Sequence, residues 1–179
     1  TIYGDFIALM PWSGGFEKMK VGFKLQGFYT PRIGTVQSKI SFLGFGGEKN
    51  IEAGEYLRVK NNKTNKFETL SGSKVNLPVS GAPEYANIYD GSISLLKVDS
   101  NGKYQYEYPT GTVYNIGYDL DEFDISDKMS NKQSVLDVEI GANFRGHDAD
   151  QNFISMIALS TDLYVPNLCY EEKIYNAAG

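Results

Sequence analysis

An acidic segment in the last third of the chain carries the residues best suited to binding a ligand. Residues 119–127 read Asp-Leu-Asp-Glu-Phe-Asp-Ile-Ser-Asp, and a second polar stretch, 146–152, contains further aspartates. Carboxylates at this density repel one another unless a cation lies among them, and calcium takes about six to eight oxygen ligands. We therefore predict a calcium site if the two segments meet at one end of the fold. Its expected ligands are Asp119, Asp121, Asp148 and Asp150.

A structural role for the same carboxylates is the alternative. Aspartate side chains accept hydrogen bonds from nearby backbone amides in turns and at helix starts, which would make the segment a solvated loop. Phe123 and Ile125 alternate with Glu122 and Asp124, so the second half of the segment also has the pattern of a strand. The segment does not match the EF-hand loop, because no glycine stands at its sixth position.

Three tyrosines form the second candidate site. Tyr104, Tyr106 and Tyr108 alternate along a predicted strand and so share one face. Tyrosine combines a large apolar ring with a polar tip, which suits core packing as well as contact with a ligand or a subunit. Because Gln105 and Glu107 make the other face polar, we favour packing against the core, with a sugar or a neighbouring subunit as the alternative partner.

Recognisable catalytic groups are scarce in this sequence. His147 is the single histidine and Cys169 the single cysteine, which is poor material for a zinc site and precludes a disulfide within the chain. The nucleophile-elbow pattern Gly-x-Ser-x-Gly does not occur. A pair of carboxylates acting as in glycoside hydrolases stays open, because aspartate and glutamate are numerous. The leading expectation is a protein without enzymatic activity.

Composition places the chain among folded globular proteins. It has 179 residues, of which 41% are hydrophobic and 22% charged, so we predict one domain over residues 1–179. A formal net charge of −5 argues against a nucleic-acid partner. No apolar run reaches the roughly eighteen residues of a membrane span. The chain starts at Thr1 without a signal peptide, which suggests a processed product or a fragment of a longer protein.

The elements that position these residues have a period of two almost throughout, which is typical of strands with one wet face. Strands are predicted over residues 5–10, 19–28, 38–45, 55–60, 66–70, 75–79, 92–98, 103–108, 133–140 and 153–160. About nine to eleven short strands separated by turn residues, with no long helix, predict an all-β protein. The expected architecture is an antiparallel β-sandwich of the jelly-roll or Greek-key type.

Two of these strands carry extra information about their place in a sheet. Pro78 cannot donate a ladder hydrogen bond, so its strand is predicted to lie at an edge. The stretch 153–159 is nearly apolar throughout, which predicts a central strand buried on both faces.

Residues 117–125, followed by Asp-Leu-Tyr-Val-Pro at 162–166, resemble a recurring acidic strand-edge motif and its exit linker. The resemblance is to β-sandwich modules of large secreted or surface-anchored bacterial proteins of the adhesin type. It implies an extracellular, non-enzymatic module, often stabilised by calcium, that acts in adhesion or cell-surface assembly. Its partners would be other copies, neighbouring domains or a glycan. A carbohydrate-binding module with the tyrosine strand as platform is the first alternative, and a carboxylate-based glycoside hydrolase the second.

Overall fold

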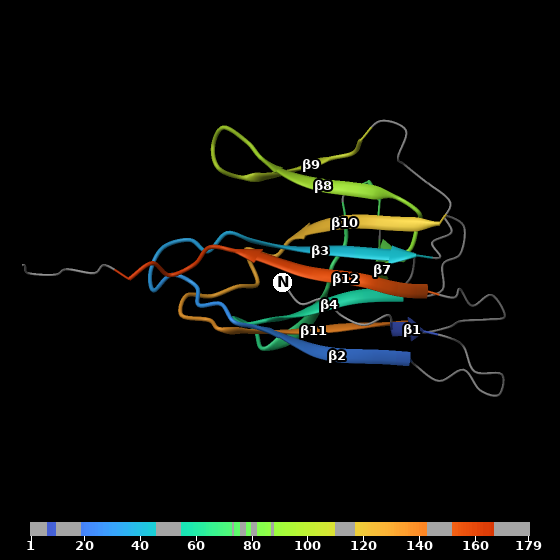
Figure 1. Cartoon of the computed structure of the whole chain (residues 1–179), viewed down its shortest axis with the longest axis horizontal. Helices are drawn as coiled ribbons and strands as arrows, with labels where there is room; N and C mark the ends of the chain where they lie inside the picture. The colour runs from blue at the N-terminus through green and yellow to red at the C-terminus, as the bar shows by residue number, and fades with distance from the viewer. Residues whose placement is uncertain are drawn as a thin grey trace, which may run out of the picture.

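Two β-sheets lie against each other with a shared apolar core (Figure 1). The computed structural model describes residues 7–9, 19–45, 55–72, 74–75, 78–79, 82–86, 88–109, 117–142 and 152–166. Within these ranges the chain forms twelve strands and no helix. The predicted all-β fold with two largely antiparallel sheets is therefore confirmed.

The larger sheet has six strands and the smaller one four. The order in the larger sheet is β1 (Ile7–Leu9), β12 (Asn152–Thr161), β3 (Ser38–Phe45), β10 (Tyr118–Asp124), β8 (Ile93–Val98) and β9 (Tyr104–Glu107). The order in the smaller sheet is β2 (Met19–Gln26), β11 (Val135–Ala142), β4 (Glu55–Asn61) and β5 (Lys66–Thr69). A separate pair joins β6 (Pro78–Val79) to β7 (Ala82–Ala86), which places Pro78 in an edge strand as predicted.

The core follows from the alternation of side chains along each strand. In β3 the even-numbered residues Ser38 to Gly44 are buried and the odd-numbered ones are more exposed. The inward side chains Ile40 and Phe42 meet those of β4 and β11, whose buried residues include Leu57 and Ile140. Each fully buried aliphatic or aromatic side chain contributes about 1.5–3 kcal/mol relative to its exposed state. The inner faces of the two sheets therefore hold the sandwich together.

An inward-facing glycine makes room for the largest buried ring. A Cβ atom on Gly44 would lie 2.6 Å from Cε1 of Tyr89, far inside van der Waals contact. The Tyr89 ring packs edge-to-face on Phe42, with centroids 5.2 Å apart and planes at 87°. Tyr89 belongs to the segment 88–92 that leads into β8. The missing side chain of Gly44 therefore leaves the space in which this segment packs against β3.

Two of the predictions for individual strands were wrong or incomplete. The apolar strand 153–159 has a strand on each side, because β12 lies between β1 and β3, but its outward residues Met156 and Ala158 are only half-buried. The acidic segment is not a loop, because Tyr118–Asp124 forms β10 in the middle of the larger sheet. Both differences bear directly on the candidate sites.

Candidate functional site

The aspartates of β10 face the core of the sandwich. Asp119, Asp121 and Phe123 point inward, and both aspartates are 0% exposed. One edge of β10 pairs with β3 along its whole length. The other edge pairs with β8, in parallel, at only two positions, Leu120 with Ile93 and Asp121 with Ser94. The backbone amides around this short ladder need other acceptors, because a buried amide without a hydrogen bond is unfavourable.

Carboxylates supply those acceptors. Oδ1 of Asp119 accepts hydrogen bonds from the amides of Gly91, at 2.5 Å, and Ser92, at 3.2 Å. Oδ1 of Asp121 accepts from the amide of Ser94 at 3.1 Å and from its hydroxyl at 2.7 Å. The acidic strand therefore uses its side chains to bind the segment 91–94 where the regular ladder is too short to do so.

Glu122 does the same from the outer face of the sheet. Its Oε2 accepts from the amide of Leu96 at 2.8 Å, and the Lys39 ammonium and the Ser41 hydroxyl donate to its Oε1 at 2.7 and 3.1 Å. Partial burial works against ionisation, but these donors outweigh it and hold the pKa of Glu122 below its ordinary value. Three carboxylates, on both faces of β10, thus fix the course of residues 91–96.

Asp119 belongs to a buried carboxylate cluster made of Glu55, Asp90, Asp119 and Asp121, all 5% exposed or less. Burial, and then the charges of Asp121 and Asp90, raises the pKa of Asp119 to about 8 despite the two backbone hydrogen bonds. Burial and the charges of Glu55 and Asp119 also raise the pKa of Tyr89 well above its ordinary value. Asp119 therefore carries a proton over most of the range below pH 8.

This geometry uses Asp119 and Asp121 differently from the predicted calcium site. One oxygen of each is committed to amides, and no group of three or more acidic, histidine or cysteine side chains in the described ranges is arranged to hold a metal ion. Asp148 and Asp150, like His147, lie outside the described residues. The four-ligand calcium site stays a prediction.

The predicted tyrosine face lies at the edge formed by β9, and all three rings are half-buried. Tyr106 and Tyr108 stack with centroids 6.0 Å apart and planes at 18°, and the Lys74 ammonium lies 5.1 Å from the Tyr108 ring centroid. Burial, followed by the effects of Tyr108 and Asp124, raises the pKa of Tyr106 to about 12. Burial and Asp124 also raise the pKa of Tyr104. The rings contact one another and the sheet rather than forming a flat exposed platform.

On the far side of the larger sheet, the described part of β1 lies beside the start of β12. Their described pairing covers residues 152–154 of β12. β12 reads Asn-Phe-Ile-Ser-Met-Ile-Ala-Leu-Ser-Thr and has no charged residue. Exposed edges in natural proteins usually carry charges, which discourage other strands from pairing there.

The other edge strands of the two sheets are short or charged. β2 carries Lys20 and Lys24, β5 carries Lys66 and Glu68, and β9 ends in Glu107. On β2 the two lysines are held by neighbours on β11, with Lys20 Nζ 3.1 Å from Glu139 and Lys24 bonded to Asp137. β12, which lies next to the margin strand β1, has no charged side chain.

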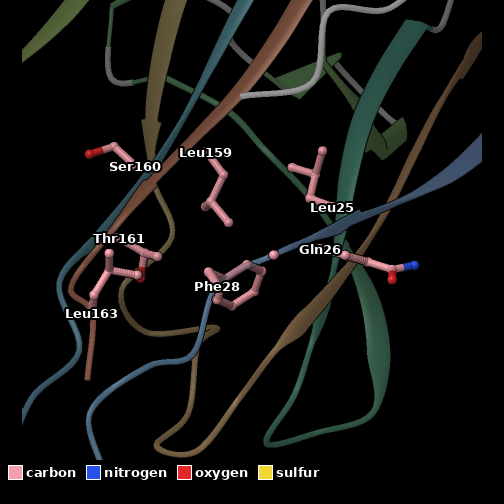
Figure 2. Close-up of a pocket in the computed structure, with 8 residues that line it drawn as sticks. Leu25, Gln26, Phe28, Leu159, Ser160, Thr161 and Leu163 are labelled. Carbon is pink, nitrogen blue, oxygen red and sulfur yellow. The ribbon is translucent and has the colours of Figure 1, made fainter. Parts of the chain in front are cut away.

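A pocket of about 310 Å³ lies beside the end of β12. It is bounded by the end of β2 on one side and the end of β12 on the other (Figure 2). Leu25, Phe28 and Leu159 face the gap, whereas Gln26 and Ser160 point away from it (Figure 2). The full lining is Leu25, Gln26, Gly27, Phe28, Leu159, Ser160, Thr161 and Leu163.

Apolar exposure continues beyond the pocket. Leu163 is 58% exposed and Val165 81%. Their segment is held alongside the β2–β3 connection, because the Tyr164 amide donates to the Tyr29 carbonyl at 2.7 Å and the Tyr164 ring lies edge-on to the Tyr29 ring. We call this pocket, together with the exposed side chains of Leu163 and Val165, the β12 pocket surface. The sequence carried one signal for it, the uniformly apolar run that had suggested burial on both faces.

Comparisons of the chain with family models, with curated proteins and with solved structures found no match. The described part of the chain also has no helix of the length and apolarity that a membrane crossing requires. Function must therefore be argued from the geometry of the carboxylate cluster, the tyrosine strand and the β12 pocket surface.

Proposed function

We propose that this chain is a non-enzymatic structural or adhesive module of a bacterial cell-surface assembly, and that it contacts a neighbouring subunit through the β12 pocket surface. The observation that carries the proposal is the uncharged strand β12 beside an apolar pocket, next to the exposed side chains of Leu163 and Val165. An exposed apolar surface beside a pocket is typical of contact with another protein. A module that acts in isolation gains nothing from such a surface and is exposed to aggregation by it.

The position of the carboxylates favours this role over hydrolysis. Glycoside hydrolases need two carboxyl groups facing a substrate cleft, about 5 to 10 Å apart. Asp119 and Asp121 are fully buried and bonded to backbone amides, where a sugar ring could not reach them. The β12 pocket, in turn, has no acidic residue in its lining.

The tyrosine strand gives less support to a carbohydrate-binding module. A sugar-binding platform needs rings whose faces are open to solvent, whereas Tyr104, Tyr106 and Tyr108 are half-buried and two of them stack on each other. Their contacts favour packing of β9 onto the sandwich. The extracellular location and calcium stabilisation belong to the proposal through the resemblance of residues 117–125 to surface modules.

Protease accessibility on intact cells tests the proposal. An epitope inserted after Thr64, in the exposed turn between β4 and β5, marks the chain without touching the β12 pocket surface. In cells that naturally produce the protein, proteinase K should remove the epitope before lysis while a cytosolic marker survives. An epitope that is protected until the cells are lysed would refute a surface role. A chromogenic glycoside panel should show no hydrolysis, and turnover that is lost with a pocket variant would refute the non-enzymatic assignment.

A further inference from the structure

We infer that the buried carboxylate cluster holds a calcium ion, with Asp119, Tyr89 and Ser92 as its protein ligands. The inference rests on the calcium stabilisation in the proposed function and gives that calcium a place between the two sheets. It differs from the four-ligand site expected from the sequence, because it needs neither Asp148 nor Asp150. All three ligands belong to the described residues, and none is more than 1% exposed.

Three buried side-chain oxygens in the described part of the chain have no hydrogen-bond partner. They are Oδ2 of Asp119, the phenolic oxygen of Tyr89 and Oγ of Ser92. Most buried polar groups in folded proteins are hydrogen-bonded, so each of these atoms needs an explanation. A single ligand that contacts all three would explain them together.

The three oxygens belong to one region of the core. The Ser92 amide donates to Oδ1 of Asp119 at 3.2 Å, which places the Ser92 side chain next to this carboxyl group. Burial, and then the charges of Glu55 and Asp119, raises the pKa of Tyr89, so its hydroxyl lies near the same cluster. A carboxylate oxygen, a phenol and an aliphatic hydroxyl therefore surround a common buried volume.

The surrounding contacts orient these groups. Oδ1 of Asp119 is held by the amides of Gly91 and Ser92, which leaves Oδ2 available to a ligand. Carboxylates that bind metals are themselves hydrogen-bonded in this way, and such contacts fix their direction. Gly44 leaves space for the Tyr89 ring, because a Cβ atom on it would lie 2.6 Å from Cε1 of that ring.

Charge selects a cation as the ligand. Asp119 forms no ion pair within the described ranges, and the charges that raise its pKa are the negative ones of Asp121 and Asp90. Buried charges in proteins are usually paired or coordinate a metal. Because all three available atoms are oxygens, the site suits a hard cation such as calcium.

The number of charged ligands sets the expected affinity. No three acidic side chains of the described residues converge on one point, so water would complete the roughly six to eight oxygen ligands of calcium. Calcium sites with few charged ligands bind weakly, and extracellular modules have dissociation constants of about 10⁻⁴–10⁻³ M. We expect an affinity in this range.

Equilibrium unfolding in guanidinium chloride over a series of calcium concentrations tests the site. Unfolding and refolding expose the core, so calcium can enter a buried site before each reading. The midpoint should begin to rise once calcium exceeds its dissociation constant, about 10⁻⁴–10⁻³ M. Magnesium at equal concentration should raise the midpoint less, because it gives up its water shell reluctantly.

Two variants each remove one hydroxyl and no charge. Tyr89→Phe and Ser92→Ala should raise the calcium concentration needed for a given stabilisation by about 10–100-fold. A purely structural role would instead lower the midpoint equally with calcium and with a chelator. Tyr118→Phe makes the same change on the outer face of the strand that carries Asp119, where Tyr118 is 41% exposed, and should keep the parental calcium dependence. Asp148→Asn should keep it as well.

A midpoint that does not depend on calcium would overturn the inference and leave buried water as the partner of the three oxygens. Parental calcium dependence in both hydroxyl variants would also overturn it. Loss of that dependence in Asp148→Asn would overturn it in favour of the four-ligand site. The protease experiment on intact cells decides the surface role separately, so either proposal can fail while the other stands.

Discussion

Replacing Asp119 with asparagine should remove most of the pH dependence of stability between pH 6 and pH 8. The carboxyl is fully buried, and burial with Asp121 and Asp90 nearby raises its pKa to about 8, against an ordinary 3.8. Tyr89 is another titratable group of this region, and burial and the charges of Glu55 and Asp119 raise its pKa. The folded state therefore binds the Asp119 proton more tightly than the unfolded state does.

The sign of the effect follows from this difference. A group with a raised pKa in the folded state stabilises the fold fully below its unfolded pKa, and that contribution is lost as pH rises through the folded pKa. Between the unfolded and folded pKa values, each pH unit changes the free energy of unfolding by about 1.4 kcal/mol. From pH 8 to pH 6 the free energy of unfolding should rise by about 2 kcal/mol, which corresponds to roughly 4–8 °C in melting temperature for a chain of this length.

Thermal melting at half-unit pH steps measures the slope. Histidine is the side chain that ordinarily titrates in this range, so a His147→Gln background removes the other expected contribution. Asp119→Asn keeps an oxygen for the Gly91 and Ser92 amides and stays neutral at every pH. The variant should show a flat profile and melt no lower than the parent at pH 8. A variant that keeps the parental slope, or that melts far lower at all pH values, would show that Asp119 is ionised in the fold.

Three further predictions concern the core, the tyrosine strand and the metal. Gly44→Ala should destabilise the protein by roughly 1–3 kcal/mol, because its Cβ would overlap the Tyr89 ring. Gly22→Ala, whose Cβ finds only one atom within 4 Å, at 3.9 Å, should leave denaturant unfolding nearly unchanged. Tyr106→Ala should cost about 2–3 kcal/mol in the same assay, somewhat less than the loss of a fully buried ring, and an unchanged midpoint would contradict core packing. Excess calcium should raise the melting temperature over that with a chelator, and more so at pH 8 than at pH 6, because metal binding requires an ionised Asp119. Identical curves at both pH values would argue against a calcium site.

Much of the fold could be predicted because most strands have a single wet face. The alternation over residues 38–45 predicts a strand with the bounds that β3 has, and the pattern from Met19 onward predicts β2 to within two residues. β10 could not be predicted in the same way, because Asp119 and Asp121 occupy inward positions at which the alternating pattern requires apolar residues. Their hydrogen-bond partners belong to residues 91–94, and no sequence feature near the aspartates indicates that segment as the partner.

The candidate sites also differ in how far the sequence could predict them. The raised pKa of Asp119 depends on its burial and on the charges of Asp121 and Asp90, and the sequence does not associate Asp90 with the acidic segment. The uniform hydrophobicity of residues 153–159 did predict two covered faces. In the structure β12 lies between β3 and β1, and its outward residues Met156 and Ala158 are half-buried. The prediction was right that the strand has a neighbour on each side and incomplete about its outer face.

The place of β3 in the larger sheet has a consequence for how the molecule is made. Its two neighbours, β10 and β12, come roughly 80 and 115 residues later in the chain. Folds dominated by such distant pairings form slowly, because the entropy cost of closing a long loop comes before the stabilising contacts that the closure allows. A ribosome would have to release the chain as far as β12 before β3 could pair along both of its edges. During that interval the apolar side chains of β3 depend on a chaperone, or on rapid folding, to avoid contact with the wrong chain.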